Sequence, residues 1–370
     1  MASIQRTKNG TWQVRYKDPN GRHRAKTYRL KVDAQKFLHS VETEIARGSY
    51  IAAERGAVDV PGWLQWHLES RSDLGVTTRN RTQGIISTHI KPKWVGVNLS
   101  DVEHAEVALW AKQLMGSGQS VRSTKKIINV MSAAFDAAVR DRRVHSNPCQ
   151  GVRFPRPTPK PKLFLTPNQV EELARATFDD RQALIVYTLA YCGLRWGELA
   201  GLRVQDFDPL RRRLNVEQTI VDDNGKMLVK PPKDHEIRSV PVPRFLVDKI
   251  AAYIAGAGGA DPIFASPRGG PLRNRNERGR WFDQAAKDIG LPGLTPHGLR
   301  HTAASMAISA GASVLSVQRM LGHSSATVTL DVYSALFEGD LDEVADRLDK
   351  VRAETGLRDS YVKTKVRDLR

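Results

Sequence analysis

The sequence predicts a multidomain protein that is mainly α-helical with small β sheets. The chain has 370 residues, more than a single hydrophobic core usually organises. Apolar and polar residues alternate near the N-terminus, as in a half-buried strand, whereas most later stretches repeat apolar residues at helical spacing. We therefore expect a small α+β domain (1–55), an all-helical domain (56–152), a linker (153–163), a mixed α/β domain (164–356) and a tail (357–370).

The first domain begins with a predicted strand at residues 11–17. Residues 18–21 have the composition of a turn, residues 22–29 return as a second strand, and apolar residues recur at helical spacing over residues 34–45. Residues 1–55 hold 12 Lys and Arg against 5 Asp and Glu, a net charge of +7 (12 minus 5). Although charge of this kind is often only a solvated face, we expect the sheet to contact a DNA groove through Arg15, Lys17, Arg22, Arg24 and Lys26.

The second domain is predicted to be helical throughout, with one clear amphipathic helix that begins near Ser123. Two groups of basic residues are candidates for phosphate contact, the second because the N–H groups of a helix start also favour anions. Either group is equally explained as solvated surface. The groups are Arg79 and Arg81, and Arg122, Lys125 and Lys126.

The charge of the whole chain indicates a polyanionic partner. The formal net charge is +17 and the pI is about 10.0, which suits nucleic acid first and an anionic membrane surface second. The membrane alternative is weak, because the longest uncharged apolar run, residues 183–194, is far shorter than the ~20 residues that a span needs. The first dozen residues carry no secretory signal, and two cysteines fit a reducing cytoplasm.

The third domain follows a linker stretch, residues 153–162, that contains four prolines and four basic residues. Thr166 is predicted to cap its first helix, with Pro167 at the first helical position and Gln169 completing a capping box. Helical patterning is interrupted by a short meander, with strands expected at residues 214–221 and 238–242 and a turn at 223–225.

Four short stretches of the third domain concentrate reactive side chains: residues 193–199, 231–236, 297–301, and 321–323 followed by Tyr333. Each has a simpler explanation by itself, since Arg195 can pair with Glu198 and Tyr333 can belong to the core. Together they supply what phosphoryl transfer needs. Two arginines can bind the non-bridging oxygens, a histidine can take a proton, a lysine can protonate the leaving oxygen and a tyrosine can attack.

In order and local sequence these stretches resemble the tyrosine recombinase family, the phage integrases in particular, whose motif reads Arg, Lys, His-x-x-Arg, His, Tyr. The neighbouring residues match too, as Gly-Leu-Arg-x-x-Glu-Leu, His-x-Leu-Arg-His, and Leu-Gly-His-Ser-Ser before the tyrosine. The resemblance implies phosphate contact by Arg195 and Arg300, and protonation of the leaving group by Lys233. It implies proton transfer and phosphate contact by His297 and His323, and attack by Tyr333.

Lys233 is chosen over two other lysines of the same hairpin, Lys226 and Lys230. The family's hairpin lysine commonly lies shortly before an Arg-Ser/Thr-Val-Pro strand, here residues 238–241. Local signals agree with the other assignments: Thr295 caps a helix that starts at Pro296, and Gly322 ends a helix just before His323.

The resemblance also implies an architecture and partners. The three domains would be an arm-binding domain, a SAM-like core-binding domain and a tyrosine recombinase catalytic domain. The substrate would be double-stranded DNA with arm-type and core-type attachment sites, bound by a homotetramer in a bacterial cytoplasm, with a DNA-bending host factor and an excisionase as further partners. Phage or mobile-element DNA would be integrated and excised without cofactor or metal.

Three alternatives remain open at this point. His297 and His301 are four apart on a helix, as in a zinc pair, with His323 or Asp331 as a third ligand; two arginines beside the cation argue against it. A non-catalytic DNA-binding regulator would not need all six catalytic positions. A type IB topoisomerase shares the chemistry, but the separate basic N-terminal domain favours an integrase.

Overall fold

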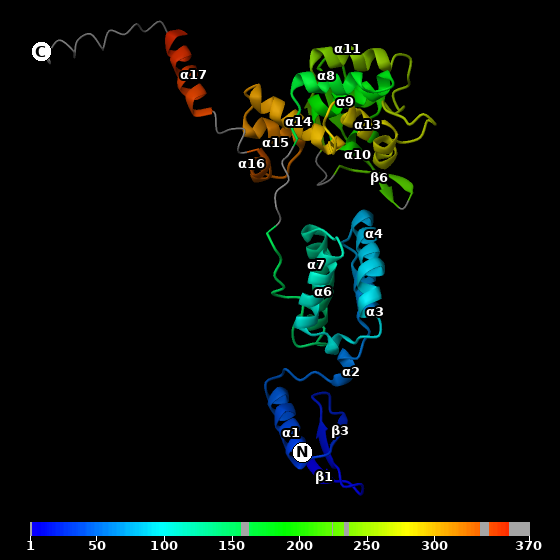
Figure 1. Cartoon of the computed structure of the whole chain (residues 1–370), viewed down its shortest axis with the longest axis vertical. Coiled ribbons are helices and arrows are strands. Elements are labelled where there is room, and N and C mark those ends of the chain that lie inside the picture. Colours follow the sequence, from blue (N-terminus) through cyan, green and yellow to red (C-terminus); the bar gives the residue numbers. More distant parts are fainter. Residues whose placement is uncertain (1, 157–162, 224, 233–236, 334–339, 355–370) are drawn as a thin grey trace, which may run out of the picture. The chain divides into compact units, whose positions relative to one another are not determined.

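The computed structural model describes residues 2–156, 163–223, 225–232, 237–333 and 340–354, so Lys233 lies outside the described residues. The chain divides into two compact units, residues 1–159 and 160–370, and is mainly helical with small sheets (Figure 1). The boundary between the units falls within the Pro-rich linker stretch. The ends predicted at residues 55 and 356 stay predictions. No helix in the described part of the chain is long and apolar enough to cross a membrane.

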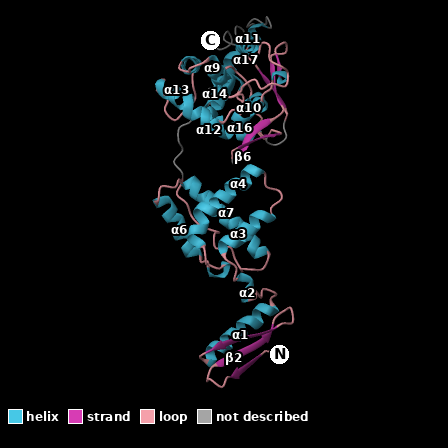
Figure 2. Cartoon of the chain, turned by 90° about the vertical axis from the view of Figure 1, so that its right-hand side faces the viewer, coloured by secondary structure: helices cyan, strands magenta, loops and turns pink. Residues whose placement is uncertain are grey.

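A three-stranded antiparallel sheet opens the first unit and packs against one helix (Figure 2). Val14 of the central strand is fully buried, and Tyr16 meets Phe37 of the helix edge-on with ring centroids 6.0 Å apart. The predicted strands and helix are confirmed, but the first strand was missed, because only Ile4 in its four residues is apolar. The elements are β1 (Ser3–Arg6), β2 (Trp12–Lys17), β3 (His23–Tyr28) and α1 (Lys31–Ala46).

The rest of the first unit is helical, as predicted, around a core rich in tryptophan. Trp63 donates from Nε1 to the carbonyl of Ala134 at 2.8 Å, and Trp94 meets Trp110 edge-on. The helices are α2 (Ala53–Gly56), α3 (Val60–Ser70), α4 (Val76–Ile85), a π-helical turn (Ile86–Ile90), α5 (Lys91–Trp94), a 3₁₀ turn (Leu99–Asp101), α6 (His104–Gly116) and α7 (Val121–Arg140).

The amphipathic helix α7 starts earlier than the sequence suggested. Ser120, not Ser123, is its N-cap, because the Ser120 hydroxyl accepts a hydrogen bond from the backbone N–H of Ser123 at 3.0 Å. Arg122, Lys125 and Lys126 are thus exposed in its first two turns.

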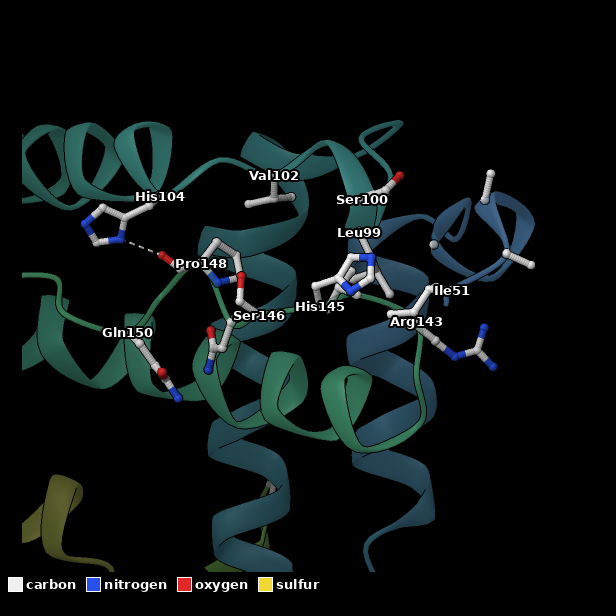
Figure 3. Close-up of a pocket in the computed structure, with 15 residues that line it drawn as sticks. Ile51, Leu99, Ser100, Val102, His104, Arg143, His145, Ser146, Pro148 and Gln150 are labelled. Atoms are coloured by element: carbon white, nitrogen blue, oxygen red, sulfur yellow. Dashed lines mark hydrogen bonds between the residues drawn. The ribbon is translucent and has the colours of Figure 1, made fainter. Parts of the chain in front are cut away.

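A pocket of about 540 Å³ lies in the first unit, where residues 51–56 meet the loops before α6 and after α7 (Figure 3). His104 faces the carbonyl oxygen of Pro148, 2.9 Å from its Nδ1. Arg55 donates to the backbone carbonyls of Asp141 and Arg142. The Arg55 contacts fasten the segment around α2 to the end of α7.

The second unit is built around α9 (Asp180–Cys192), whose apolar residues are buried on almost every side. The capping box of Thr166 and Gln169 is confirmed at the start of α8. The other helices are α8 (Pro167–Arg175), α10 (Trp196–Gly201), a 3₁₀ turn (Val204–Asp206), α11 (Arg244–Tyr253), α12 (Asn274–Glu277), a π-helical turn (Arg278–Phe282), α13 (Asp283–Asp288), α14 (Pro296–Ser309), α15 (Val314–Leu321), α16 (Ala326–Tyr333) and α17 (Asp340–Glu354).

The predicted meander is wrong in its pairing. Residues 214–221 do not form one strand, because the chain leaves the first sheet at Glu217 and Gln218, whose side chains bind Arg203 and the Gly201 carbonyl. Two separate sheets result, with orders β4-β5-β8 and β6-β7. The strands are β4 (Phe207–Asp208), β5 (Arg213–Val216), β6 (Thr219–Asp223), β7 (Lys226–Lys230) and β8 (Arg238–Pro241).

Candidate active site

The start of α14 carries three of the candidate residues. Thr295 caps the helix by accepting from the N–H of Gly298 at 3.1 Å, as predicted. The rings of His297 and His301, one turn apart, meet edge-on with centroids 4.6 Å apart. Arg300 is only 2% exposed and donates to the backbone carbonyls of Gly193 and Leu321. One helix start therefore presents a buried guanidinium and two imidazoles.

The C-terminal end of α15 collects three guanidinium groups. The chain leaves α15 at Gly322, which has φ of 63°. The backbone carbonyls of the last helical residues therefore have no hydrogen-bond partners inside the helix. Helix C-termini also carry partial negative charge, which favours cations. The donors and acceptors are Arg238 Nε to Met320 O at 3.1 Å, Arg300 Nη2 to Leu321 O at 2.6 Å, and Arg195 Nη2 to Gly322 O at 2.8 Å.

Glu198 is the carboxylate that balances part of this charge. It is 1% exposed and accepts from both Arg238 Nη atoms, at 2.9 and 2.6 Å, and from Arg195 Nη1 at 2.8 Å. Burial by itself would raise the pKa of Glu198, but the hydrogen bonds and charges of the two arginines outweigh it and hold that pKa below its usual value. With Arg300 included, this arginine cluster has a net charge of +2 (three guanidinium groups minus one carboxylate).

Arg300 also ties α15 to the end of α9. Its Nη1 donates to the carbonyl of Gly193 at 2.7 Å, and Gly193, with φ of 65°, is the C-cap of α9. A Cβ at Gly193 would lie 2.7 Å from Leu321 Cδ2, so only glycine allows both the turn and this approach. Burial and the charge of Arg195 lower the pKa of Arg300 to about 9, so the guanidinium stays protonated at neutral pH.

Tyr333, the last described residue of α16, is 1% exposed and packs with Ile308, Val317 and Leu321. Its hydroxyl lies 2.7 Å from Nδ1 of His301. Burial raises the pKa of Tyr333 to about 12, although the charge of Arg300 acts in the opposite direction. The phenol is therefore neutral at neutral pH and close enough to the arginine cluster to feel its charge.

His323 follows Gly322 directly, at a turn as predicted, and its Nδ1 lies 2.9 Å from the Thr329 hydroxyl. Burial, followed by the charges of Arg300 and Arg195, lowers its pKa to about 4. Burial and the same two arginines lower the pKa of His297 as well. Both imidazoles are thus neutral at neutral pH, and each can donate one N–H or accept one proton.

The structure brings five of the six predicted catalytic residues into one region of the second unit. The charge of Arg300 acts on Tyr333, His297 and His323, and the charge of Arg195 acts on Arg300 and on both histidines. Both arginines also donate to carbonyls at the end of α15. The structural roles that seemed to compete with catalysis are also present, because Arg195 pairs with Glu198 and Tyr333 is buried.

Two residues were missed as members of this site. Arg238 lies in the Arg-Ser-Val-Pro strand β8, and no local pattern in the sequence indicates that it reaches Glu198. His301 was considered as half of a zinc pair, although it borders the Tyr333 hydroxyl. Among the described residues, no group of three or more His, Cys, Asp or Glu side chains is arranged to hold a metal ion.

The predicted DNA-contact residues of the first unit are mostly exposed, with two exceptions. Arg24 is half-buried and pairs with Asp18 and Glu54. Arg79 donates to the carbonyls of Leu68 and Arg71 at the end of α3. These two guanidinium groups are therefore engaged inside the protein. The exposed members are Arg15, Lys17, Arg22, Lys26, Arg81, Arg122, Lys125 and Lys126.

Three basic residues meet at a groove of about 640 Å³ in the first unit. Arg122 and Lys125 come from α7, and Arg156, which was not among the predicted contacts, comes from the chain that follows the helical part. Asn129 and Ser132 line the same groove. Cations and hydrogen-bonding groups around one depression are typical of a phosphate-binding surface.

Comparison with known proteins matches two parts of the chain to family models. The model described as "Phage integrase family" matches residues 163–339, and "Phage integrase, N-terminal domain" matches residues 2–47. A prophage phiRv2 integrase of Mycobacterium tuberculosis is 28% identical over 363 residues, which cover 94% of this chain and 95% of that relative.

Two solved structures share the fold. The Tn1549 transposon integrase in complex with circular intermediate DNA has a TM-score of 0.68 at 22% identity, and the match covers 79% of this chain and 99% of that one. A lambda integrase tetramer bound to a Holliday junction has a TM-score of 0.57 at 20% identity, covering 88% of this chain and 96% of that one.

We predict that Glu198→Gln destabilises the second unit strongly. The substitution removes a buried carboxylate and leaves Arg238, whose side chain is 6% exposed, without its counter-charge. The expected loss in the free energy of unfolding is about 3 kcal/mol, measured by urea denaturation. Asp283→Asn is the control, because its pair with Arg278 is largely exposed and should cost less than about 1 kcal/mol. Equal losses in the two variants would contradict the role given to Glu198.

The lowered pKa of His323 predicts a loss of stability in acid. Between its ordinary pKa of 6.5 and its folded value of about 4, the unfolded chain binds a proton at this residue that the folded chain does not. The contribution is therefore present above pH 6.5 and lost as the pH falls toward 4. We expect the urea midpoint to fall across this window, and less steeply in His323→Asn, which keeps a polar atom near the Nδ1 position. An unchanged slope in the variant would refute this.

Proposed function

Because this chain belongs to the phage integrase family of tyrosine recombinases, we propose that it cleaves and rejoins DNA strands at defined sites through Tyr333. The observation that carries this proposal is the net charge of +2 on the arginine cluster, with the Tyr333 hydroxyl within its electrostatic reach. A phosphodiester needs such preorganised positive charge where negative charge develops during transfer.

The reaction has two symmetrical steps. The Tyr333 oxygen attacks the scissile phosphate, a 3′-phosphotyrosine forms, and the 5′ oxygen leaves with a proton supplied by Lys233. A 5′ hydroxyl of the partner duplex then attacks the phosphotyrosine. The energy of the phosphodiester is conserved in the protein–DNA bond, so the scheme requires neither ATP nor a metal ion.

The arginines and histidines stabilise this exchange. Arg195 and Arg300 donate to the non-bridging oxygens, for which their fixed forks are well shaped. Arg195, whose side chain is 31% exposed, is the member of the cluster most open to an incoming backbone. His297 and His323 serve phosphate contact and proton transfer, and their lowered pKa values make them neutral N–H donors rather than additional cations.

The remaining parts bind DNA away from the reacting phosphate. We assign the N-terminal sheet to arm-type sites and the helical part, with the second unit, to core-type sites. The exposed basic residues of β2 and the groove at Arg122, Lys125 and Arg156 support this division. A DNA-bending host factor and an excisionase complete the proposed set of partners, in the cytoplasm of a bacterial host.

Exchange between two duplexes requires four active sites, so the proposed active form is a homotetramer on DNA. The tetrameric lambda integrase supports this by its likeness to the chain. The helix α17 leaves Leu348 and Val351 65% and 59% exposed, a face suited to packing on a neighbouring subunit. Sedimentation of the full chain on DNA with paired sites should give complexes that hold four subunits on two duplexes. A topoisomerase-like enzyme acts without a partner site, so it would give two subunits for two duplexes.

Tyr333→Phe should abolish covalent capture of DNA while binding is retained. The test incubates the full chain in EDTA with a nicked duplex that carries the attachment site, so that the released end diffuses away and the adduct persists. Denaturing electrophoresis then separates adduct from free DNA. Tyr253→Phe, on a half-exposed tyrosine of α11, should capture DNA as the wild type does. An adduct that survives Tyr333→Phe, or that forms only without EDTA, would contradict the proposal.

Lys125→Gln should weaken DNA binding and reduce its salt dependence. Each lysine that neutralises a phosphate releases counterions, so its loss should lower the slope of log affinity against log salt by about 1. Lys112→Gln, on an exposed lysine of α6, is the matched control and should leave the slope unchanged. Fluorescence anisotropy over a salt series measures both. Equal slopes in the two variants would remove the groove from the DNA interface.

A further inference from the structure

The hydroxyl of Tyr333 has a specific partner that the motif alone did not assign. Within the described residues, its hydrogen bond is to Nδ1 of His301, at 2.7 Å. The two rings have centroids 5.7 Å apart and meet edge-on. His301 is itself held between two other rings, His297 at 4.6 Å and Phe164 at 6.5 Å, both edge-on. Packing therefore fixes the orientation in which Nδ1 faces the tyrosine.

The two histidines of the motif are arranged differently. His323 directs Nδ1 toward Thr329, 2.9 Å away, and His297 contacts the ring of His301 instead of the tyrosine. Arg300, one residue before His301, points to the carbonyls of Gly193 and Leu321. Consecutive residues of α14 thus have different neighbours, since Arg300 joins the arginine cluster at the end of α15 and His301 contacts the Tyr333 hydroxyl.

A buried phenol needs a proton acceptor in order to attack. The neutral hydroxyl is a poor nucleophile, and its burial disfavours a free phenolate before attack begins. General-base catalysis requires an acceptor within hydrogen-bond distance of the proton that it removes. The 2.7 Å contact meets that requirement without movement of either side chain.

We propose that His301 is a catalytic residue of this chain, whose Nδ1 accepts the proton of Tyr333 as the tyrosine oxygen attacks the phosphate. The inference rests on the proposed function and refines it, because it leaves His297 and His323 to the phosphate. The imidazole acts as the tautomer that carries its proton on Nε2, with the lone pair of Nδ1 toward the hydroxyl.

The step is balanced in atoms and charge. The O–H bond of Tyr333 breaks and its proton moves to His301, giving an imidazolium; the bond from phosphorus to the tyrosine oxygen forms. The bond from phosphorus to the 5′ oxygen breaks, and that oxygen takes a proton from the acid of the proposed reaction. In the rejoining step the 5′ hydroxyl gives its proton back to that acid as its oxygen bonds to phosphorus. The bond from phosphorus to the tyrosine oxygen breaks, and the imidazolium returns its proton to that oxygen.

The test compares two reactions of the full chain on the same site. The first is capture of a nicked duplex, which needs Tyr333 to lose its proton. The second is run in a Tyr333→Phe background, so that the tyrosine cannot attack, and joins a 5′ hydroxyl strand to a strand whose 3′ phosphate is esterified with p-nitrophenol. That leaving group needs no protonation, so this joining uses the phosphate site without the tyrosine.

Two variants separate proton transfer from packing. His301→Phe keeps a ring against His297 and Phe164 but removes the acceptor, whereas His301→Gln can accept a hydrogen bond but cannot take the proton. Both should slow capture at least about 100-fold, the scale of general-base catalysis. Each of them, combined with Tyr333→Phe, should join the nitrophenyl ester at nearly the rate of Tyr333→Phe alone. The second reaction also reports whether each variant is folded.

The other outcomes overturn the inference. Wild-type capture in His301→Gln would show that the contact only positions Tyr333. Wild-type capture in His301→Phe would remove any role for the contact. Parallel loss of both reactions would assign His301 to the phosphate or to folding. Failure of the proposed function itself looks different, because the wild-type chain would then capture no DNA.

Discussion

The second unit depends on the way three guanidinium groups meet the last carbonyls of α15. Arg195 comes from the start of α10, Arg238 from β8 and Arg300 from α14, and their acceptors lie at residues 320–322. Helix ends have few other ways to satisfy these carbonyls inside a protein. The contacts fasten the segments that carry the site to one short turn, and Gly322 lets the chain leave that turn toward His323.

The same contacts explain how so much positive charge is held before DNA arrives. A buried charge without partners is costly, but each guanidinium here donates to at least one carbonyl, and Glu198 balances two of them directly. The balance is incomplete, since one carboxylate faces three arginines. We propose that a DNA phosphate supplies the remaining negative charge, and lowered pKa values keep His297 and His323 from adding further cations. Tyr333 is buried within reach of this charge.

Local signals in the sequence predicted helix ends better than strand pairing and long-range side-chain contacts. Thr166, Thr295 and Gly322 mark helix ends by chemistry that acts within a few residues, and the structure has those ends. The strand break at Glu217 and Gln218 depends on partners 14 and 17 residues away, and the contact of Arg238 with Glu198 spans 40 residues. No local pattern in a single sequence indicates which distant residues will come into contact. His301 was undervalued for the same reason, because its meaning depends on a tyrosine 32 residues later.

We propose that the charge of the arginine cluster directs a DNA phosphate to Tyr333. Mass spectrometry of the captured protein–DNA adduct, after digestion with nuclease and trypsin, identifies the residue that carries the phosphate. The tryptic peptide of residues 320–347 contains Tyr333 as well as serines and threonines, so fragmentation must assign the modified residue. We expect a nucleotide joined through its 3′ phosphate to Tyr333. A phosphate on Ser324, Ser325 or any other residue, or a link through a 5′ phosphate, would contradict it.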